Sequence, residues 1–191
     1  MEPFKNQPLT DFKDEKNVKA QKDALQEVKK QLGKSYPNIV NGEEVISEKK
    51  TVSKNPAFPD QVIGEFQKSG QEDAENAIQS AAAAFEEWKK VPASERANIL
   101  LKASEEMKRR RLEINAWMTY EAGKNYAESD ADTAEAIDFM EFYAREAIRY
   151  AEDQPLTPFE PEKNRYFYIP LGVGICIPPW NFPYAIMVGI S

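Results

Sequence analysis

The residues best suited to chemistry lie together in the run Pro178-Pro-Trp-Asn-Phe-Pro183. The side-chain amide of Asn181 can donate a hydrogen bond to an oxygen on which negative charge develops. Such a donor has to be held still, and the prolines on both sides of the run stiffen its backbone, as a binding or catalytic role requires. The residues alone nevertheless favour a structural turn in which Trp180 is buried and Asn181 caps the next helix.

Other candidates for chemistry are weaker. Gly172-Val-Gly174 lacks the third glycine of a dinucleotide fingerprint and precedes an apolar run instead of following it. Cys176 is the single cysteine and lies among apolar residues, so a buried structural thiol is favoured over a nucleophile. The chain has no histidine, which excludes Ser-His and Cys-His couples and leaves a zinc site unsupported. We therefore expect no metal site.

Charge and hydropathy limit the classes of partner. The 191 residues include 25 Lys and Arg against 32 Asp and Glu, and the net charge of −7 opposes binding to nucleic-acid phosphates. The basic run Lys108-Arg-Arg-Arg111 follows a helical pattern and is interpreted as a solvated face. No segment has the roughly eighteen apolar residues of a membrane span, and the first residues lack the apolar core of a signal peptide. We expect a cytoplasmic protein without nucleic-acid or membrane partners.

Several elements must position the Asn181 run. Apolar spacing predicts helices over residues 14–32, 72–89, 112–122, about 129–150, and from an N-cap at Ser94 through Met107. Asn41-Gly42 between apolar pairs predicts a hairpin over residues 38–46, and residues 51–55 and 62–66 predict a second strand pair. An acidic stretch on the last helix is interpreted as solvated or as complementing the helix dipole (Glu128, Asp130, Asp132, Glu135, Asp138 and Glu141).

After a proline-rich surface connection, two short β-type runs lead into the Asn181 run: Arg165 to Ile169 and Val173 to Ile177. The second run is almost wholly apolar, which is typical of a strand covered on both faces in a parallel sheet. Helices followed by a buried strand and a further helix predict an α/β fold. Ligands of such folds bind in the crevice at the carboxyl ends of the strands, where Asn181 is expected.

The run Pro179-Trp-Asn-Phe-Pro183 resembles the pentapeptide that the aldehyde dehydrogenase superfamily carries after the first strand of its Rossmann-type domain. The runs Glu121-Ala-Gly-Lys124, Glu128 to Tyr143 and Tyr168 to Gly174 are similar to bacterial 1-pyrroline-5-carboxylate dehydrogenases. The resemblance implies the N-terminal part of that α/β fold, with mainly helices, short β-hairpins and the first strand of the NAD-binding domain.

The same resemblance implies a domain division. Residues 1–36 would form an arm and a peripheral helix, and residues 37–191 the N-terminal part of the NAD-binding domain. Within the latter, residues 155–171 would form a linker and a strand of an oligomerisation hairpin, so a dimer-based homo-oligomer is expected. The catalytic domain, with the nucleophilic cysteine and the general-base glutamate, would lie outside these residues, and this piece alone would be inactive.

The activity implied is oxidation of L-glutamate γ-semialdehyde, in equilibrium with 1-pyrroline-5-carboxylate, to L-glutamate with NAD, in proline degradation. Asn181 matches the family's oxyanion donor, Phe182 the aromatic beside the substrate, and Glu135 a residue of the aldehyde tunnel. Residues matching those along the cofactor are Ile177, Pro178, Pro179 and Trp180. Two alternatives stay open: another NAD(P)-dependent aldehyde dehydrogenase, and a non-catalytic helical interaction module.

Overall fold

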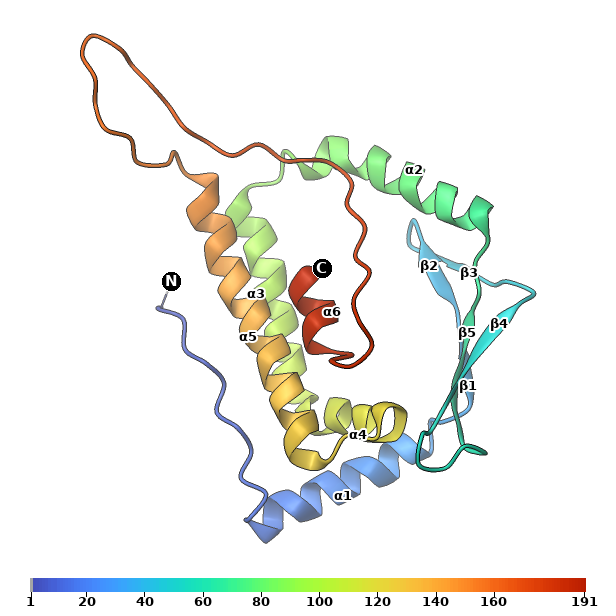
Figure 1. The fold of residues 1–191 in the computed structure, drawn as a ribbon. Helices are drawn as coiled ribbons and strands as arrows, with labels where there is room; N and C mark the ends of the chain where they lie inside the picture. The colour runs from blue at the N-terminus through green and yellow to red at the C-terminus, as the bar shows by residue number, and fades with distance from the viewer. Residues whose placement is uncertain (1) are drawn as a thin grey trace.

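The computed structural model describes residues 2–191. Figure 1 shows helices α1 and α3 to α6 gathered on one side, and the strands with α2 on the other. The protein is thus a mixed α/β structure, mostly helices with small sheets. Its elements in chain order are α1 (Glu15–Lys29), β1 (Lys34–Tyr36), β2 (Asn38–Val40), β3 (Glu43–Val45), β4 (Lys50–Lys54), β5 (Val62–Gln67), α2 (Gln71–Trp88), α3 (Ala93–Arg109), α4 (Arg111–Ala122), α5 (Tyr126–Ala151) and α6 (Ala185–Ile190).

Helix α5 is the centre of the helical part and packs against α3, α4 and α6. It begins three residues before the expected Ser129, because Asn125 caps it and exchanges hydrogen bonds with Glu128 in a capping box. Its inward face is built from small and apolar side chains that let the neighbouring helices approach closely: Ala134, Ala136, Ile137 and Ala144 are buried. The predicted helix over residues 129–150 is therefore confirmed, with an earlier start.

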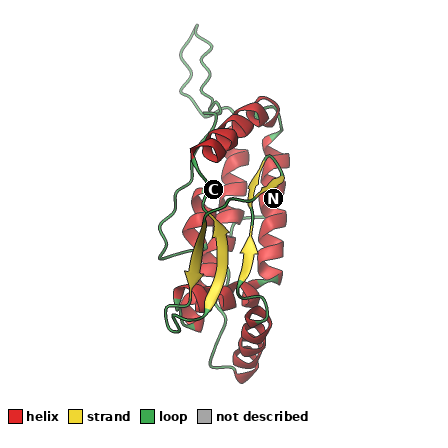
Figure 2. Ribbon diagram, turned by 90° about the vertical axis from the view of Figure 1, so that its right-hand side faces the viewer, coloured by secondary structure: helices red, strands yellow, loops and turns green. Residues whose placement is uncertain are grey.

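The strands form two small sheets, which lie in front of the helices in Figure 2. The hairpin of β2 and β3 is confirmed, with Asn41 and Gly42 at φ 53° and 79° as a tight turn requires. The antiparallel pair of β4 and β5 is also confirmed. Strand β1, which pairs parallel with β5, was not predicted, since its residues Lys-Ser-Tyr carry no apolar alternation.

The expected buried strand over Val173 to Ile177 does not form. These residues run as an extended segment in which Ile175 and Ile177 are 72% and 83% exposed, and Cys176 is exposed rather than buried. A strand requires a neighbour with which to exchange backbone hydrogen bonds, and no other segment of residues 2–191 pairs with this one. Of the expected run from Arg165 to Ile169, only Tyr166 pairs, in a single bridge to Gln154.

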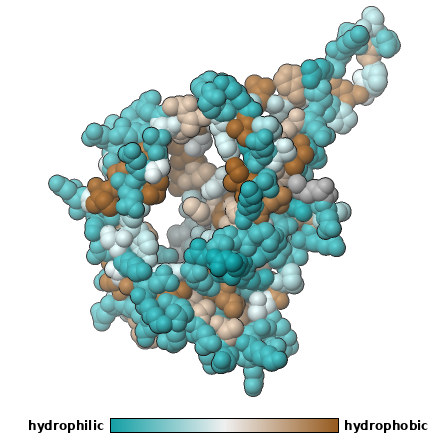
Figure 3. Space-filling view, turned by 180° about the vertical axis from the view of Figure 1, so that it is seen from behind, coloured by the Kyte–Doolittle hydropathy of each residue, from teal (hydrophilic) through white to brown (hydrophobic). Residues whose placement is uncertain are grey.

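Two smaller expectations are wrong. Helix α1 ends at Lys29 instead of residue 32, and α3 begins at Ala93 with Pro92 as its N-cap residue, so Ser94 lies inside the helix. The apolar stripe of α2 is not covered, because Ile78 and Trp88 are 41% and 47% exposed and α2 touches little besides β2. The space-filling view in Figure 3 shows open space between this side and the helices. No helix among residues 2–191 is long and apolar enough to cross a bilayer.

Candidate functional site

The candidate site is the corner between the extended segment and α6, formed by residues 178–184. Asn181 is exposed, and its side-chain amide forms no hydrogen bond with any of residues 2–191. The residue before α6 is Tyr184, which makes no side-chain capping bond, so Asn181 does not cap this helix. Trp180 is 86% exposed and is not a buried structural anchor. The amide of Asn181 is therefore free to donate to a ligand.

One carboxylate fixes the end of this corner. The Oδ1 atom of Asp132 accepts a hydrogen bond of 2.6 Å from the backbone N–H of Ala185, the first residue of α6. Its Oδ2 atom accepts from Nζ of Lys124, also at 2.6 Å. The same Nζ lies 4.2 Å from the centroid of the Phe182 ring, within the range of a cation–π contact. Lys124, Asp132 and Phe182 thus form a cluster at the corner.

Apolar burial anchors the other side of the corner. Ala185 and Val188 of α6 pack on Ala136 of α5 in a small core cluster that Tyr184 also contacts. Burial raises the pKa of the Tyr184 hydroxyl above its ordinary value, against an opposing effect of Arg110, so this hydroxyl is neutral at physiological pH. The corner is consequently tied to α5 by both a polar contact and a packed helix.

The other predicted site residues are Glu135 on α5 and residues 177–180 before the corner. Glu135 is exposed and stands one turn after Asp132 on the same helix, and it forms no hydrogen bond or ion pair within residues 2–191. Ile177 and Pro179 are exposed and Pro178 is half-buried. Their backbone makes no hydrogen bond within the described chain, and nothing covers the apolar face of Ile177 or Trp180. Residues 177–180 therefore make few contacts within residues 2–191.

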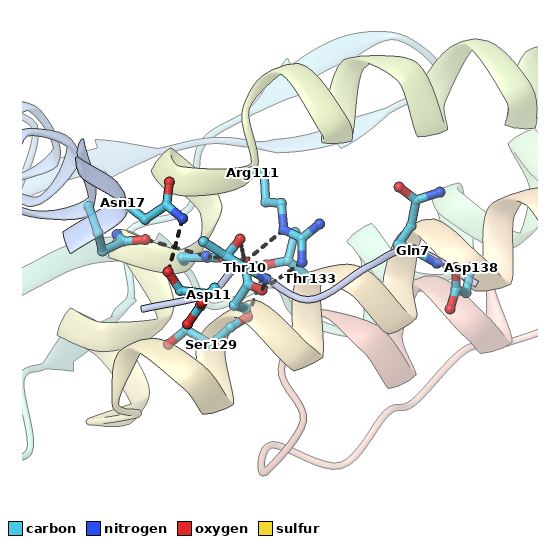
Figure 4. Close-up of polar contacts among 11 residues, drawn as sticks. Gln7, Thr10, Asp11, Asn17, Arg111, Ser129, Thr133 and Asp138 are labelled. Carbon is cyan, nitrogen blue, oxygen red and sulfur yellow. Dashed lines mark hydrogen bonds and ion pairs between the residues drawn. The ribbon is translucent and has the colours of Figure 1, made fainter. Parts of the chain in front are cut away.

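Asp130 and Asp132, which we expected at the solvated surface, are instead each 1% exposed. Asp130 binds Arg111 through both oxygens at 2.7 and 2.6 Å. It also accepts from the N–H and hydroxyl of Thr10 at 2.7 and 2.8 Å, which docks the N-terminal arm on α5, and from Asn115. Figure 4 shows the polar contacts in this region, with Thr10, Arg111 and Thr133 labelled.

Burial acts to raise the pKa of the Asp130 carboxyl. The hydrogen bonds from Arg111, Thr10 and Asn115 outweigh burial and hold its pKa below the ordinary value. One signal in the sequence marks these aspartates as buried: they alternate with small residues in Ser-Asp-Ala-Asp-Thr-Ala, a composition that suits a closely packed helix face. Lys124 was also missed as a site residue, because it lies beyond the apolar pattern of either neighbouring helix.

The comparisons with known proteins agree with one another. A family model described as the aldehyde dehydrogenase family matches residues 44–190. The 1-pyrroline-5-carboxylate dehydrogenase 2 of Bacillus subtilis (strain 168) is 52% identical over 189 residues, which make up 99% of this chain and 37% of that protein. The 1-pyrroline-5-carboxylate dehydrogenase 1 of Halalkalibacterium halodurans is 52% identical over 191 residues, with 100% and 37% covered.

A similar arrangement is found among solved structures. The crystal structure of 1-pyrroline-5-carboxylate dehydrogenase from Thermus with bound NAD superposes with a TM-score of 0.94 at 44% sequence identity. It is matched over 100% of this chain and 37% of its own length. The chain therefore spans about 37% of the length of the relatives that it matches.

Proposed function

Because this chain belongs to the aldehyde dehydrogenase family, we propose that it serves in the oxidation of L-glutamate γ-semialdehyde, in equilibrium with 1-pyrroline-5-carboxylate, to L-glutamate with NAD. Relatives about half identical over nearly the whole chain are 1-pyrroline-5-carboxylate dehydrogenases. A place for the protein in proline degradation is part of the same proposal.

The observation that carries the proposal is the free amide of Asn181. It is exposed at a corner that prolines stiffen, and its N–H groups form no hydrogen bond with residues 2–191. An amide held in this way can donate to the oxygen of a bound aldehyde as negative charge develops on it. The donor is useful because it is already in place, so no reorganisation is needed when the charge appears.

The neighbouring residues take supporting roles in this proposal. Phe182 would flank the aliphatic part of the substrate, and Glu135 would line the path by which the aldehyde enters. Ile177, Pro178, Pro179 and Trp180 would lie along NAD and orient it through backbone and apolar contacts. When bound, NAD supplies the acceptor for the hydride.

The domain division is part of the proposal. Residues 1–36 would contribute the arm, the peripheral helix α1 and strand β1, which pairs with β5 of the part formed by residues 37–191. Residues 37–191 would contribute to the NAD-binding domain, with residues 173–177 as a strand once further strands lie beside them. Residues 155–171 would form a linker and a strand of the oligomerisation hairpin of a dimer-based assembly. The nucleophile and the base come from sequence outside these residues, since Cys176 donates its thiol hydrogen to the carbonyl of Ile190 and has no base beside it. A cytoplasmic location stays a prediction.

The experiment is an assay of the protein that carries this segment, with L-glutamate γ-semialdehyde and with simple aliphatic aldehydes of similar length, and with NAD or NADP. We expect kcat/KM with the semialdehyde and NAD to exceed that with the aliphatic aldehydes by at least the roughly tenfold that one good polar contact provides. Equal turnover of both substrates would reject the proposed substrate and leave a general aldehyde dehydrogenase. Absence of turnover with every aldehyde would favour a non-catalytic interaction module.

A further inference from the structure

We propose that Lys124 and Asp132 are positioning residues for Asn181, acting through the start of α6 and the ring of Phe182. The inference rests on the proposed function of Asn181 and Phe182. Lys124 and Asp132 bind each other, so we assign neither of them a direct contact with the aldehyde.

The two oxygens of Asp132 hold two different parts of the molecule together. Oδ1 holds the backbone of Ala185, four residues after Asn181, and Oδ2 holds Nζ of Lys124. Between residues 177 and 185 the only other backbone hydrogen bonds are the first ones of α6, from Ile186 to Phe182 and from Val188 to Tyr184. The Asp132 contact is therefore the polar tie between the corner and the long helix α5.

Lys124 is itself held firmly. It lies between Gly123, which ends α4 at φ 68°, and Asn125, which caps α5. Its position is thus fixed by the turn between two helices, and glycine is the residue that adopts this φ without strain. From there its ammonium group reaches both the carboxylate of Asp132 and the face of Phe182, which is the residue next to Asn181.

The two charges depend on each other because the carboxylate is buried and the ammonium group is half-buried. The side chain of Asp132 is 0% exposed and that of Lys124 is 13% exposed. A charged group removed from water in this way is costly unless it is paired and hydrogen-bonded. With Lys124 in place, the carboxylate of Asp132 accepts a hydrogen bond from the N–H of Ala185. The turn before α5 positions Lys124, and through Asp132 it also orients the corner.

The consequence for catalysis is geometric. A displacement of about 1 Å at a positioned group can lower a rate by on the order of a hundredfold. Loss of either charge is therefore expected to lower kcat for the aldehyde by roughly tenfold to a hundredfold, with little change in the KM for NAD. Lys124→Arg keeps the charge and the contact with the ring, and we expect it to retain most of the rate.

The test compares Asp132→Asn, Lys124→Met and Lys124→Arg in the complete enzyme, each alone and combined with Asn181→Ala. If the pair acts through Asn181, Asp132→Asn lowers kcat in the wild type but changes it by less than about twofold in the Asn181→Ala background. The matched control is Lys108→Met, which breaks the ion pair with Glu141 between α3 and α5, away from the corner. We expect the control to leave kcat unchanged.

Fully multiplicative losses in the double variants would overturn the inference, because they would indicate a general structural effect. If Asn181→Ala alone leaves turnover unchanged, the role proposed for Asn181 fails, and a measurement without substrate then decides the positioning claim. Hydrogen exchange of the Ala185 amide is expected to become at least tenfold faster in Lys124→Met and to stay unchanged in Lys108→Met. Equal exchange in wild type and Lys124→Met would overturn the positioning claim whatever Asn181 does.

Discussion

Removal of the Asp130 carboxylate is expected to release the N-terminal arm from α5. Two hydrogen bonds from Thr10 end on this carboxylate, one from its N–H and one from its hydroxyl. A hydrogen bond to a charged group contributes about 1.5–3 kcal/mol, so the loss of both weakens docking of the arm by at least about 3 kcal/mol, or on the order of a hundredfold. Asp130→Ala also leaves the half-buried guanidinium of Arg111 without its partner, which lowers the stability of the contact between α4 and α5 in addition.

Limited proteolysis with trypsin measures this release, because Lys5 and Lys13 in the arm are exposed and become cleavable when the arm detaches. We expect cleavage of Asp130→Ala at these lysines to be faster by on the order of a hundredfold. The control is Asp153→Ala, which removes an exposed ion pair with Arg165 and is expected to leave the rate of cleavage in the arm unchanged. Equal cleavage of Asp130→Ala and wild type would refute the reasoning and show that the other contacts suffice to hold the arm.

Two further predictions concern stability. The lowered pKa of Asp130 means that its contribution is complete above the unfolded value of about 3.9 and is lost as the pH falls through the folded value. Denaturant unfolding should therefore show the free energy of unfolding falling more steeply below about pH 4 in wild type than in Asp130→Asn; parallel curves would contradict this. Gly189→Ala would place its Cβ 2.7 Å from Cδ2 of Phe139, which should cost about 1–3 kcal/mol and lower Tm, whereas Gly174→Ala meets no atom within 4 Å and should leave Tm nearly unchanged.

The sequence was sufficient for the local elements whose signals are local. The Asn41-Gly42 turn and the apolar periods over residues 112–122 and 129–150 each predicted an element that the structure contains. Strand β1 could not be predicted, because its three residues are too few to show an alternation of apolar and polar side chains. The prediction of a strand over residues 173–177 is wrong although the signal in its composition is strong. Its apolar composition suits a covered strand, but pairing depends on neighbouring strands that residues 2–191 do not provide.

The candidate site likewise has one part that the sequence predicts and another that only the fold brings together. Asn181 and Phe182 can be predicted as candidates, because prolines and aromatic residues mark the corner in one short run. Lys124 and Asp132 come from a turn and a helix more than fifty residues earlier, so only the fold brings them to that corner. Burial of an aspartate is decided by what covers the helix, and the charge of Asp130 gave no hint of Arg111 and Thr10 around it.

The most direct test of the account is the single-turnover rate of NADH formation from L-glutamate γ-semialdehyde by the complete enzyme with Asn181→Ala. Loss of one oxyanion donor typically lowers the rate by about a hundredfold to a thousandfold, and we expect that loss with an unchanged affinity for NAD. A rate equal to that of the wild type would contradict the claim that the free amide at the proline-braced corner stabilises charge on the aldehyde oxygen.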